Sequence, residues 1–524
     1  MEIEVLLAIT MFLVAIGALL AGFPVALTLG GVALVFALIG IGLGAFPEPL
    51  LRAFPNRIQG AMENQVLIAV PLFVLMGVIL ERSKVAEDLL HIAGRLLGKM
   101  RGGLGFAVIG VGALLAASTG IVGATVITMA LIALPTMLRE GYDPRLASGT
   151  IAASGTLGQI IPPSIVLILL ADAISNANQT ASASAGVGPS VVSVGDLFAG
   201  ALIPGLLLVC IYLLYVLYHA LFRPETCPPV SQMDEDPVSA SDMAFGLGAP
   251  LLLIITVLGS ILGGIASPTE AAAVGAVGAL LLAGLRLSVD QPAWSRRALV
   301  LGLLALVVVF TMAGTLDLRV NRADLTSGDM AAITVAAALC LVFFASLAIA
   351  LLVLSRAGQL RPALSNASSI TAMVFLILIG ASLFSLVFRG FGGDDFVADL
   401  LAATPGGAWG ALVITMLVMF VLGFFLDFIE IVFVVVPLVA PPLIIMGFDP
   451  VWLAILMALN LQTSFLTPPF GFALFYLRGA APESLSTIDI WRGAIPFIGL
   501  QITMIALVAT FPLLATHLPE IAAR

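Results

Sequence analysis

Two short stretches of the sequence combine uncharged polar side chains with a pair of adjacent prolines inside apolar segments. Gly155–Ser164 reads G-T-L-G-Q-I-I-P-P-S, and Asn460–Gly471 reads N-L-Q-T-S-F-L-T-P-P-F-G. A proline pair removes two backbone donors and clashes with the preceding turn, so we expect helix breaks at Pro162–Pro163 and at Pro468–Pro469. Backbone groups freed at such breaks need other partners, and within a membrane they typically line a site.

Sodium is the ion that such groups suit best. It is a hard cation that prefers several oxygen ligands, and freed backbone carbonyls together with Ser, Thr and Asn oxygens supply them. We therefore predict sodium ligands in both stretches and in the polar or glycine-containing breaks that precede them along the chain. The candidates are Ser118, Thr119, Gly120, Ser154, Gly155, Thr156, Gly158, Gly423, Asp427, Asn460, Gln462, Thr463 and Thr467.

An organic anion is expected between the two stretches. Hydroxyl and amide groups donate hydrogen bonds to a carboxylate, and the N-terminal ends of half-helices attract negative charge. The predicted substrate ligands are Thr156, Ser164, Asn460 and Thr467, with Thr156 and Thr467 at matched tips. For any single hydroxyl, an alternative is ordinary packing between membrane helices. The duplicated pattern favours a site, because packing does not require a paired break.

The charged residues in this part of the sequence permit more than one role. Asp427 and Glu430 are three positions apart, hence on one helix face, and a carboxylate within an apolar span is a candidate ion ligand. Asp427 also suits a helix cap or an ion pair with Arg389. The guanidinium of Arg389 could bind a substrate carboxylate with two hydrogen bonds. Its neighbours Gly390–Asp395 instead suggest a loop at the membrane edge.

The two stretches belong to an internal repeat. Pro162 and Pro468 are 306 positions apart, and the same offset joins the turn G-Y-D-P at Gly141–Pro144 to G-F-D-P at Gly447–Pro450. The chain is therefore predicted to contain two related halves, each with one proline-broken hydrophobic segment. Corresponding interrupted segments in two halves point to the midplane binding site of an inverted-repeat secondary transporter.

Composition places these segments in a membrane. Hydrophobic residues make up 61% of the 524 residues, charged residues 10%, and the mean hydropathy is +1.19. This excludes a soluble domain and predicts an all-α polytopic membrane protein, because the apolar runs lack the period-two alternation of barrel strands. We expect eleven or more crossings plus two re-entrant segments. Met1–Leu20 lacks the features of a cleaved signal peptide.

Several other classes of function are excluded by the sequence. The formal charge of −9 and the 21 lysines and arginines provide no nucleic-acid-binding face. Cys210, Cys227 and Cys340 are isolated, so neither a disulfide framework nor a metal-ligand spacing is present. The chain has no G-x-x-x-x-G-K-[ST] phosphate cradle, and transport driven directly by ATP is therefore not expected. No cofactor is predicted beyond the coupling ion.

The segments that must position the broken stretches follow one another along the chain. Glu81–Arg101 has apolar residues at helical spacing with basic residues around them, and we interpret it as an interfacial helix on the cytoplasmic side; a partner-docking arm is the alternative. Asn176–Ser190 is expected to be a polar loop.

The predicted units are scaffold and interfacial helices at 1–103, a first transport half at 104–222 with a re-entrant hairpin at 146–171, a loop and scaffold helices at 223–298, an inserted hydrophobic hairpin and connection at 299–369, and a second half at 370–524 with a re-entrant hairpin at 453–477.

Four separated motifs closely resemble those of one known family. They are the paired G-x-D-P turns, G-T-L-G-Q-I-I-P-P-S, S-P-T-E-A-A-A-V-G at Ser267–Gly275, and N-x-Q-x-x-x-x-T-P-P-F-G. Together they resemble the large membrane subunit of TRAP transporters, the tripartite ATP-independent periplasmic family. The resemblance covers nearly the whole chain except Leu299–Leu354.

The resemblance implies a sodium-driven importer of organic acids in the bacterial inner membrane. It also implies two partners, a small four-helix membrane subunit and a periplasmic substrate-binding protein, and an elevator mechanism in which a domain holding both hairpins slides against a scaffold. The A-S-T-G break at Ala117–Gly120, and the insertion at Leu299–Leu354 together with F-L-D-F-I-E at Phe425–Glu430, depart from the usual pattern. They suggest a subgroup, so the expected substrate is a dicarboxylate or a 2-oxo or hydroxy monocarboxylate.

Two other functions are kept as alternatives. A standalone sodium-coupled carboxylate symporter would use the same paired hairpins without soluble partners. An intramembrane aspartyl protease is the remote alternative, because Tyr142–Asp143 resembles half of that signature. No G-x-G-D follows, and Asp143 lies in a turn that Asp449 repeats, whereas catalysis would require a second carboxylate facing the first. We therefore expect no enzyme.

Overall fold

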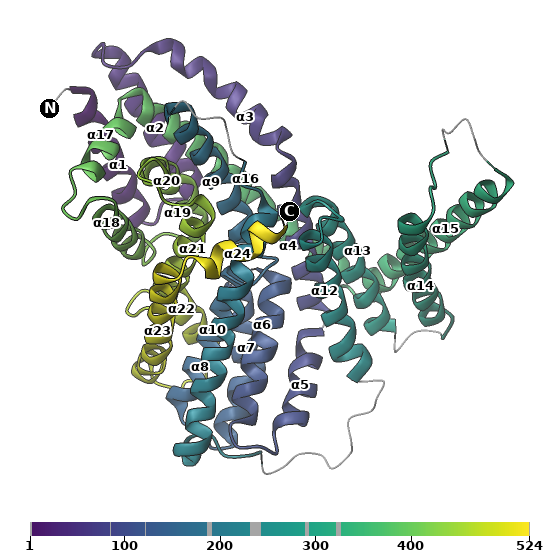
Figure 1. Cartoon of the computed structure of the whole chain (residues 1–524). Helices are drawn as coiled ribbons and strands as arrows, with labels where there is room; N and C mark the ends of the chain where they lie inside the picture. Colours follow the sequence, from purple (N-terminus) through teal and green to yellow (C-terminus); the bar gives the residue numbers. More distant parts are fainter. Residues whose placement is uncertain are drawn as a thin grey trace.

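The computed structural model describes residues 3–83, 85–120, 122–185, 191–230, 243–288, 293–320 and 326–522, and throughout these ranges the regular elements are helices (Figure 1). Ten of the described helices are long and apolar enough to cross a membrane, or eleven if the bent pair α19 and α20 is one span. The prediction of an all-α polytopic membrane protein is confirmed.

The elements of the first part of the chain are α1 (Ile3–Leu20), α2 (Val25–Gly42), η1 (Glu48–Ala53), α3 (Phe54–Glu63), α4 (Gln65–Arg82), α5 (Val85–Leu97), α6 (Gly103–Thr119), α7 (Val122–Arg139), α8 (Pro144–Thr156), η2 (Leu157–Gln159), α9 (Ile165–Ala185), α10 (Val194–Phe222) and η3 (Pro224–Thr226). Those of the second part are η4 (Met243–Gly248), α12 (Ala249–Leu262), α13 (Pro268–Leu287), α14 (Ala293–Thr315), α15 (Ser327–Arg356), α16 (Leu360–Gly390), α17 (Gly393–Ala402), α18 (Gly407–Leu422), α19 (Phe428–Val434), α20 (Val436–Ile445), α21 (Pro450–Leu466), α22 (Phe472–Ala480), α23 (Thr487–Thr510) and α24 (Leu513–Ala522).

The G-x-D-P turns have the same local structure in both copies. Gly141 and Gly447 take left-handed backbone conformations at φ 83° and 100°, which a residue without a Cβ adopts readily at a helix end. Asp143 and Asp449 then cap the next helix, with Oδ1 accepting from the backbone amides of Arg145 and Trp452 at 2.7 and 2.8 Å. A proline follows at the first helical position, where its missing N–H costs nothing.

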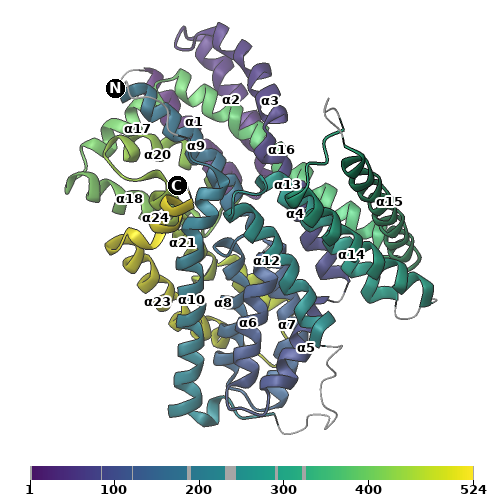
Figure 2. The same cartoon turned by 45° about the vertical axis from the view of Figure 1, so that its right-hand side comes forward.

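Two pairs of long helices that are far apart in the sequence pack along each other. α4 lies along α13, and α16 lies along α2 (Figure 2). The contact between α2 and α16 is close, because a Cβ on Gly380 would lie 2.4 Å from the backbone oxygen of Ala26. Because α16 also packs on α4, the helices α2, α4, α13 and α16 form one connected group.

α14 and α15 form a hairpin that projects away from the remaining helices in both views (Figures 1 and 2). Leu304, Val308 and Phe344 are among its exposed apolar side chains, as expected for a surface facing lipid. The hairpin begins at Ala293 rather than Leu299. Residues 360–369, expected to be a connection, are instead the first turns of the 31-residue helix α16.

The predicted loop at Asn176–Ser190 is wrong for most of its length, since α9 continues to Ala185. Ala177 and Ala181 are buried, so this part of the helix packs against the protein. The hydroxyl of Thr180 donates to the carbonyl of Asn176 at 2.9 Å, which satisfies a polar side chain within the helix. The predicted segment ended at Ala171, but α9 continues well beyond that residue. Residues 186–190 lie outside the described ranges.

Candidate ion and substrate site

Both proline pairs lie in breaks between two helices. In the first half, α8 and the 3-10 turn η2 end at Gln159, and α9 begins at Ile165; in the second half, α21 ends at Leu466 and α22 begins at Phe472. Each break contains one cis peptide bond, Pro162–Pro163 or Pro468–Pro469. The structure thus places the four helix-breaking prolines in two helix breaks, and α8 and α9 do not pack along each other as the arms of a hairpin would.

The two breaks differ in exposure. Pro162 and Pro163 are buried, as is Ser164. In the second break Pro469 is exposed, and the side chain of Phe470 is 43% exposed. In this conformation, therefore, the second break reaches the surface of the protein while the first is enclosed.

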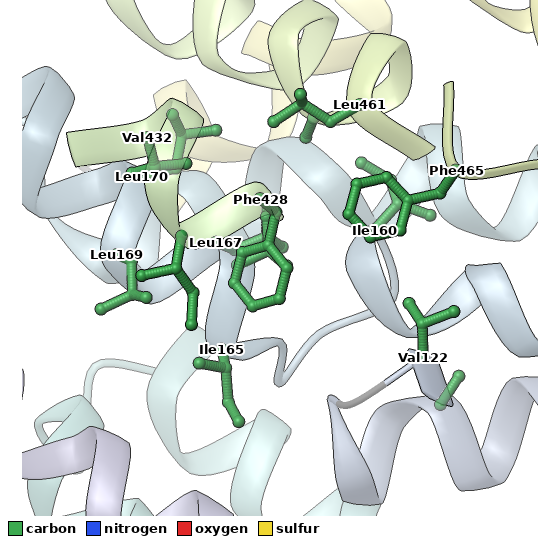
Figure 3. Packing of buried hydrophobic residues seen from close by; sticks show 14 of the residues in the cluster. Val122, Ile160, Ile165, Leu167, Leu169, Leu170, Phe428, Val432, Leu461 and Phe465 are labelled. Carbon is green, nitrogen blue, oxygen red and sulfur yellow. The ribbon is translucent and has the colours of Figure 1, made fainter. Parts of the chain in front are cut away.

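Apolar side chains from both breaks pack in one cluster (Figure 3). Ile160 precedes the first proline pair and Phe465 precedes the second, and both belong to the cluster that contains Phe428 of α19 and Leu167 of α9. This packing excludes water around the polar groups of the hairpins, which increases the strength of any electrostatic interaction there.

A hydrogen-bonded network of four buried side chains joins α8, α10, α21 and α23. Gln462 Nε2 of α21 and Gln501 Nε2 of α23 donate to Thr156 Oγ1 of α8 at 3.4 and 3.2 Å. Gln501 Nε2 also lies 2.8 Å from the hydroxyl of Tyr212 on α10. Thr156 in turn donates to the carbonyl of Ala153 at 2.8 Å, so its one donor and two acceptor positions are all used.

The repeat pairs Thr156 with a different residue from the one expected. Thr156 and Gln462 are separated by the repeat offset of 306 positions, so Gln462 is the counterpart of Thr156. By the same offset the counterpart of Thr467 is Ile161. The expectation that Thr156 and Thr467 occupy matched tips is therefore wrong, because Thr467 lies five residues further along its stretch.

The remaining candidate hydroxyls use their protons within the hairpins. Ser154 Oγ donates to the carbonyl of Thr150 at 2.6 Å, Thr463 Oγ1 to Leu459 at 2.8 Å, and Thr467 Oγ1 to Thr463 at 2.8 Å. Ser164 Oγ donates to the carbonyl of Gln159 at 3.0 Å. A hydroxyl that donates to its own backbone still has oxygen lone pairs with which it can bind a cation.

Three buried amide side chains have oxygen atoms without a hydrogen-bond partner among the described residues. They are Gln159, Gln462 and Gln501, and the amide nitrogen of Gln159 is also unpaired. An unsatisfied buried polar group costs about 1–3 kcal/mol, so these oxygens favour a bound cation or water. The neighbouring Asn460 differs, because its Nδ2 donates to the carbonyl of Met416 on α18 at 2.8 Å.

Glycines allow α6, α7 and α18 to approach the hairpins closely. Gly120 ends α6 at φ 60°, and a Cβ there would lie 3.1 Å from the backbone nitrogen of Ile165. A Cβ on Gly423 would lie 2.2 Å from Ser464 Oγ, and one on Gly155 2.2 Å from a methyl of Val126. Gly158 lies in η2 beside Ala116. Ser118 and Thr119 are the last two residues of α6, and their side chains lie outside what the structure describes.

Asp427 has the local role of a helix cap. It follows the break after α18, and its Oδ1 accepts from the backbone amide of Phe428 at 2.7 Å. The described residues contain no ion pair between Asp427 and Arg389. Glu430 is 7% exposed and lines a narrow cavity with Phe12, Leu29 and other apolar residues of α1, α2 and α16. Its carboxyl therefore lies on the side of α19 that faces these helices.

Arg389 lies in the last turn of α16, next to a second arginine. Its Nε is buried without a hydrogen-bond partner among the described residues. Burial lowers the pKa of Arg57 on α3, and the positive charge of Arg389 lowers it further. The side chain of Arg389 therefore lies at the end of α16, near a second positive charge.

Sequence reasoning missed Tyr212, Gln159 and Gln501. Gln159 stands inside the motif G-T-L-G-Q-I-I-P-P-S, and Gln501 is a single amide within the apolar run F-I-G-L-Q-I-T-M. An isolated amide in a span is a signal that could have identified Gln501, because a polar side chain there requires a partner. Tyr212 gives no such signal, since tyrosines are common in membrane helices.

Comparison with known proteins agrees with the observed architecture. The sequence model of the family described as "Tripartite ATP-independent periplasmic transporter, DctM component" matches residues 11–316 and 287–514. The C4-dicarboxylate TRAP transporter large permease protein DctM of Vibrio cholerae is 26% identical, covering 98% of this chain and 97% of that protein. The ectoine TRAP transporter large permease protein TeaC of Halomonas elongata is 27% identical, covering 97% and 98%.

Two further comparisons concern a different substrate and a solved structure. The sialic acid TRAP transporter large permease protein SiaM of Vibrio cholerae is 25% identical and covers 97% of each chain. The YdaH transporter of Alcanivorax borkumensis, whose crystal structure is described as having an unusual topology, superposes with a TM-score of 0.51 at 14% identity, covering 89% of this chain and 90% of that one. At this identity the likeness shows a shared fold alone.

The matched residues extend over nearly the whole chain, and the relatives are components of bacterial transport systems. The chain is therefore a multi-pass membrane protein and a transporter component rather than an enzyme, which excludes the protease hypothesis. In agreement, Asp143 caps α8. The chain belongs to the DctM family, the large permease subunits of tripartite ATP-independent periplasmic transporters.

Proposed function

We propose that this chain imports an organic acid anion together with sodium, as the large subunit of its three-component system. The anion is a dicarboxylate or a 2-oxo or hydroxy monocarboxylate, delivered by a periplasmic binding protein, and a small four-helix membrane subunit completes the complex. Relatives named for C4-dicarboxylates and for sialic acid support an organic acid, and the family description supports a tripartite system.

The observation that carries the proposal is the set of buried oxygen atoms where the two broken hairpins meet. The side-chain oxygens of Gln462 and Gln501 are buried without a partner in the described part of the chain, and Thr463 of α21 and Thr467, the residue after α21, add hydroxyl oxygens from the same segment. Several oxygens and no basic side chain suit a hard monovalent cation better than they suit an anion alone.

We assign the sodium ligands to the two hairpins and to the helix breaks beside them. In the first half the hydroxyl of Ser154 and the backbone near Gly120 and Gly158 supply oxygens; in the second half Asn460, Gln462, Thr463 and Thr467 do so, together with the backbone near Gly423. Thr156 has a different role, because its three hydrogen bonds leave no lone pair for an ion. It positions the two amides.

The substrate anion binds between the two breaks, where Ser164, Asn460 and Thr467 supply polar groups. The N-terminal end of α22 contributes, because its first amides have no intrahelical partner and carry partial positive charge. Exposure of Pro469 and Phe470 supports access to this region from one side of the membrane in the observed conformation.

Transport follows an elevator mechanism in which α6–α10 and α18–α23 move together past a scaffold of α1–α4 and α12–α16. The interlocked packing of α2, α4, α13 and α16 supports the scaffold, and the buried network of Thr156, Gln462, Gln501 and Tyr212 supports a rigid moving unit. Asn64 Nδ2 at the start of α4 donates to Asp172 of α9 at 2.7 Å, a bond that must break when α9 moves past α4.

The test is uptake into proteoliposomes that contain all three components. Uptake should require an inward sodium gradient and proceed without ATP. Undiminished uptake without sodium would contradict the coupling ion. Adding the binding protein should increase uptake at low substrate concentration, whereas equal rates with and without it would favour the standalone sodium-coupled symporter.

A further inference from the structure

Gln159 lies in the first helix break, and its side chain has no hydrogen-bond partner. Both Oε1 and Nε2 are buried and unpaired, and within the described part of the chain Gln159 is the one amide for which this holds. The residue is fully buried in η2, which packs against α6, α7, α8, α9 and α21. Buried polar groups are nearly always paired, so a ligand that pairs with this amide is expected when the protein functions.

The break itself does not require an amide at this position. By the repeat offset of 306, the counterpart of Gln159 is Phe465. Phe465 is 3% exposed and belongs to the apolar cluster, and its ring centroid lies 5.1 Å from that of Phe472 (Figure 3). The second half thus forms its break with an apolar side chain at the equivalent position, and the amide of the first half needs another explanation.

The surroundings of Gln159 are polar but uncharged. The hydroxyl of Ser164, a proposed substrate ligand, donates to the main-chain carbonyl of Gln159 at 3.0 Å. The helices packed against η2 contain three charged residues. Arg139 and Arg145 flank the G-Y-D-P turn, at the opposite end of α8 from the break, and Asp172 lies two turns along α9. A basic side chain that would neutralise a second substrate charge is therefore absent from these helices near the break.

A ligand that satisfies this amide must supply both a donor and an acceptor. Oε1 accepts hydrogen bonds and Nε2 donates them. A carboxylate has acceptor oxygens alone, and a sodium ion pairs with Oε1 alone, so each leaves one atom of the amide unpaired. A hydroxyl next to a carboxylate, as in a 2-hydroxy acid, provides a donor and an acceptor on adjacent carbon atoms.

We propose that Gln159 selects a 2-hydroxy monocarboxylate as the substrate, with the hydroxyl donating to Oε1 and one carboxylate oxygen accepting from Nε2. This role of Gln159 rests on the proposed function and narrows its substrate class. A 2-oxo acid and an unsubstituted acid leave Oε1 unpaired. A dicarboxylate does the same and adds a negative charge.

The experiment measures thermal unfolding of the purified full-length chain in detergent with sodium present. The binding protein is left out, so that its own selectivity does not enter. The probes are lactate, pyruvate, propionate and malonate, which all have three carbon atoms and differ in the group beside the carboxylate. For each probe the measured quantity is the concentration that gives half of the maximal rise in unfolding temperature.

Lactate should act at a concentration at least fivefold lower than the other three acids, because a site that pairs with a hydroxyl rejects analogues without it. In Gln159→Leu this preference should disappear, and the three monocarboxylates should act at similar concentrations. Equal action of lactate and propentionate-free controls is not the comparison; equal action of lactate and propionate on the wild type, as expected if water or sodium pairs with the amide, overturns the proposal. A lactate preference that persists in Gln159→Leu, or no effect of lactate on the wild type, also overturns it. Sodium-driven uptake of another organic acid would in those cases leave the proposed function intact.

The unfolding temperature without any acid separates ligand binding from a structural role. Gln159→Leu should raise it, because the change removes a buried amide without a partner. A lower temperature would show that the folded protein itself uses the amide, and would overturn the proposal. Gln59→Leu is the matched control, since Gln59 is exposed on α3 and donates to Glu63 at 2.9 Å. It should keep the lactate preference, and loss of the preference in this control would also contradict the role of Gln159.

Discussion

Gln462 donates a hydrogen bond to Thr156, and the two residues occupy the same position in the two copies of the repeat, 306 residues apart. The contact is asymmetric in chemistry, because one copy has a hydroxyl and the other an amide. The contact thus brings matched positions of the two copies together within the polar network.

Replacing Thr156 by Val should destabilise the protein. Valine keeps the volume but removes the oxygen that accepts from Gln462 and Gln501, which leaves the buried amide of Gln462 without its described partner and Gln501 with Tyr212 alone, at a cost of about 1–3 kcal/mol. Thermal unfolding in detergent measures the change. Thr180→Val is the matched control, because Thr180 makes only the bond to its own helix at Asn176 among the interactions described. An unfolding temperature equal to that of the control would show that the network contributes no stability.

Sodium dependence should change in Thr463→Val and in Thr467→Val. In each variant the lost hydroxyl donates its proton within its own segment, so its oxygen is available to an ion. Removing it should therefore weaken the binding of sodium. Loss of a ligand at about 1–3 kcal/mol raises the sodium concentration for half-maximal uptake roughly five- to hundred-fold. Thr503→Val is the control, since Thr503 makes the same kind of bond, to Gly499 at 2.8 Å, on an exposed face of α23. Unchanged sodium dependence in both variants would restrict the ligands to amides and backbone carbonyls.

Replacing Asp427 and replacing Glu430 should have different effects on transport. Asp427→Asn retains a side-chain oxygen that can cap α19 but removes the negative charge of this candidate ion ligand, so it should raise the sodium concentration for half-maximal uptake without unfolding the helix. Glu430→Gln should leave sodium dependence unchanged, because Glu430 faces α1, α2 and α16. Uptake measured over a range of sodium concentrations compares them. If only Glu430→Gln changed the sodium dependence, the ion would lie on the side of α19 that faces α1, α2 and α16.

The sequence predicts the helix breaks well, because they follow from local chemistry. Two adjacent prolines end a helix wherever it packs, and G-x-D-P sets a left-handed glycine, a cap and a first helical residue within four positions. The same reasoning fails at Asn176–Ala185, where burial of Ala177 and Ala181 outweighs the polar composition. Tertiary packing decides that helix, and a single sequence does not contain the packing directly.

The polar network was only half predictable for a related reason. Thr156 and Gln462 stand in recognisable motifs, whereas Gln501 and Tyr212 come from separate helices that meet the hairpins only after folding. The repeat offset could have predicted that Thr156 corresponds to Gln462. It could not have predicted that the two side chains touch, since that depends on how the two copies are rotated against each other.

The last prediction concerns access to the two breaks. In a chain whose Cys210, Cys227 and Cys340 are replaced, Phe470→Cys should react with a membrane-impermeant maleimide from one side only, while Ile161→Cys should react poorly, because Phe470 is 43% exposed and Ile161 8%. Right-side-out and inverted vesicles supply the two sides. If the hairpins move together as one unit past the scaffold, any condition of sodium and substrate that increases labelling at Ile161→Cys must decrease it at Phe470→Cys, because opening one break to water encloses the other. A rise at both positions under the same condition would mean that the breaks open independently, and the elevator mechanism would then be incorrect for this protein.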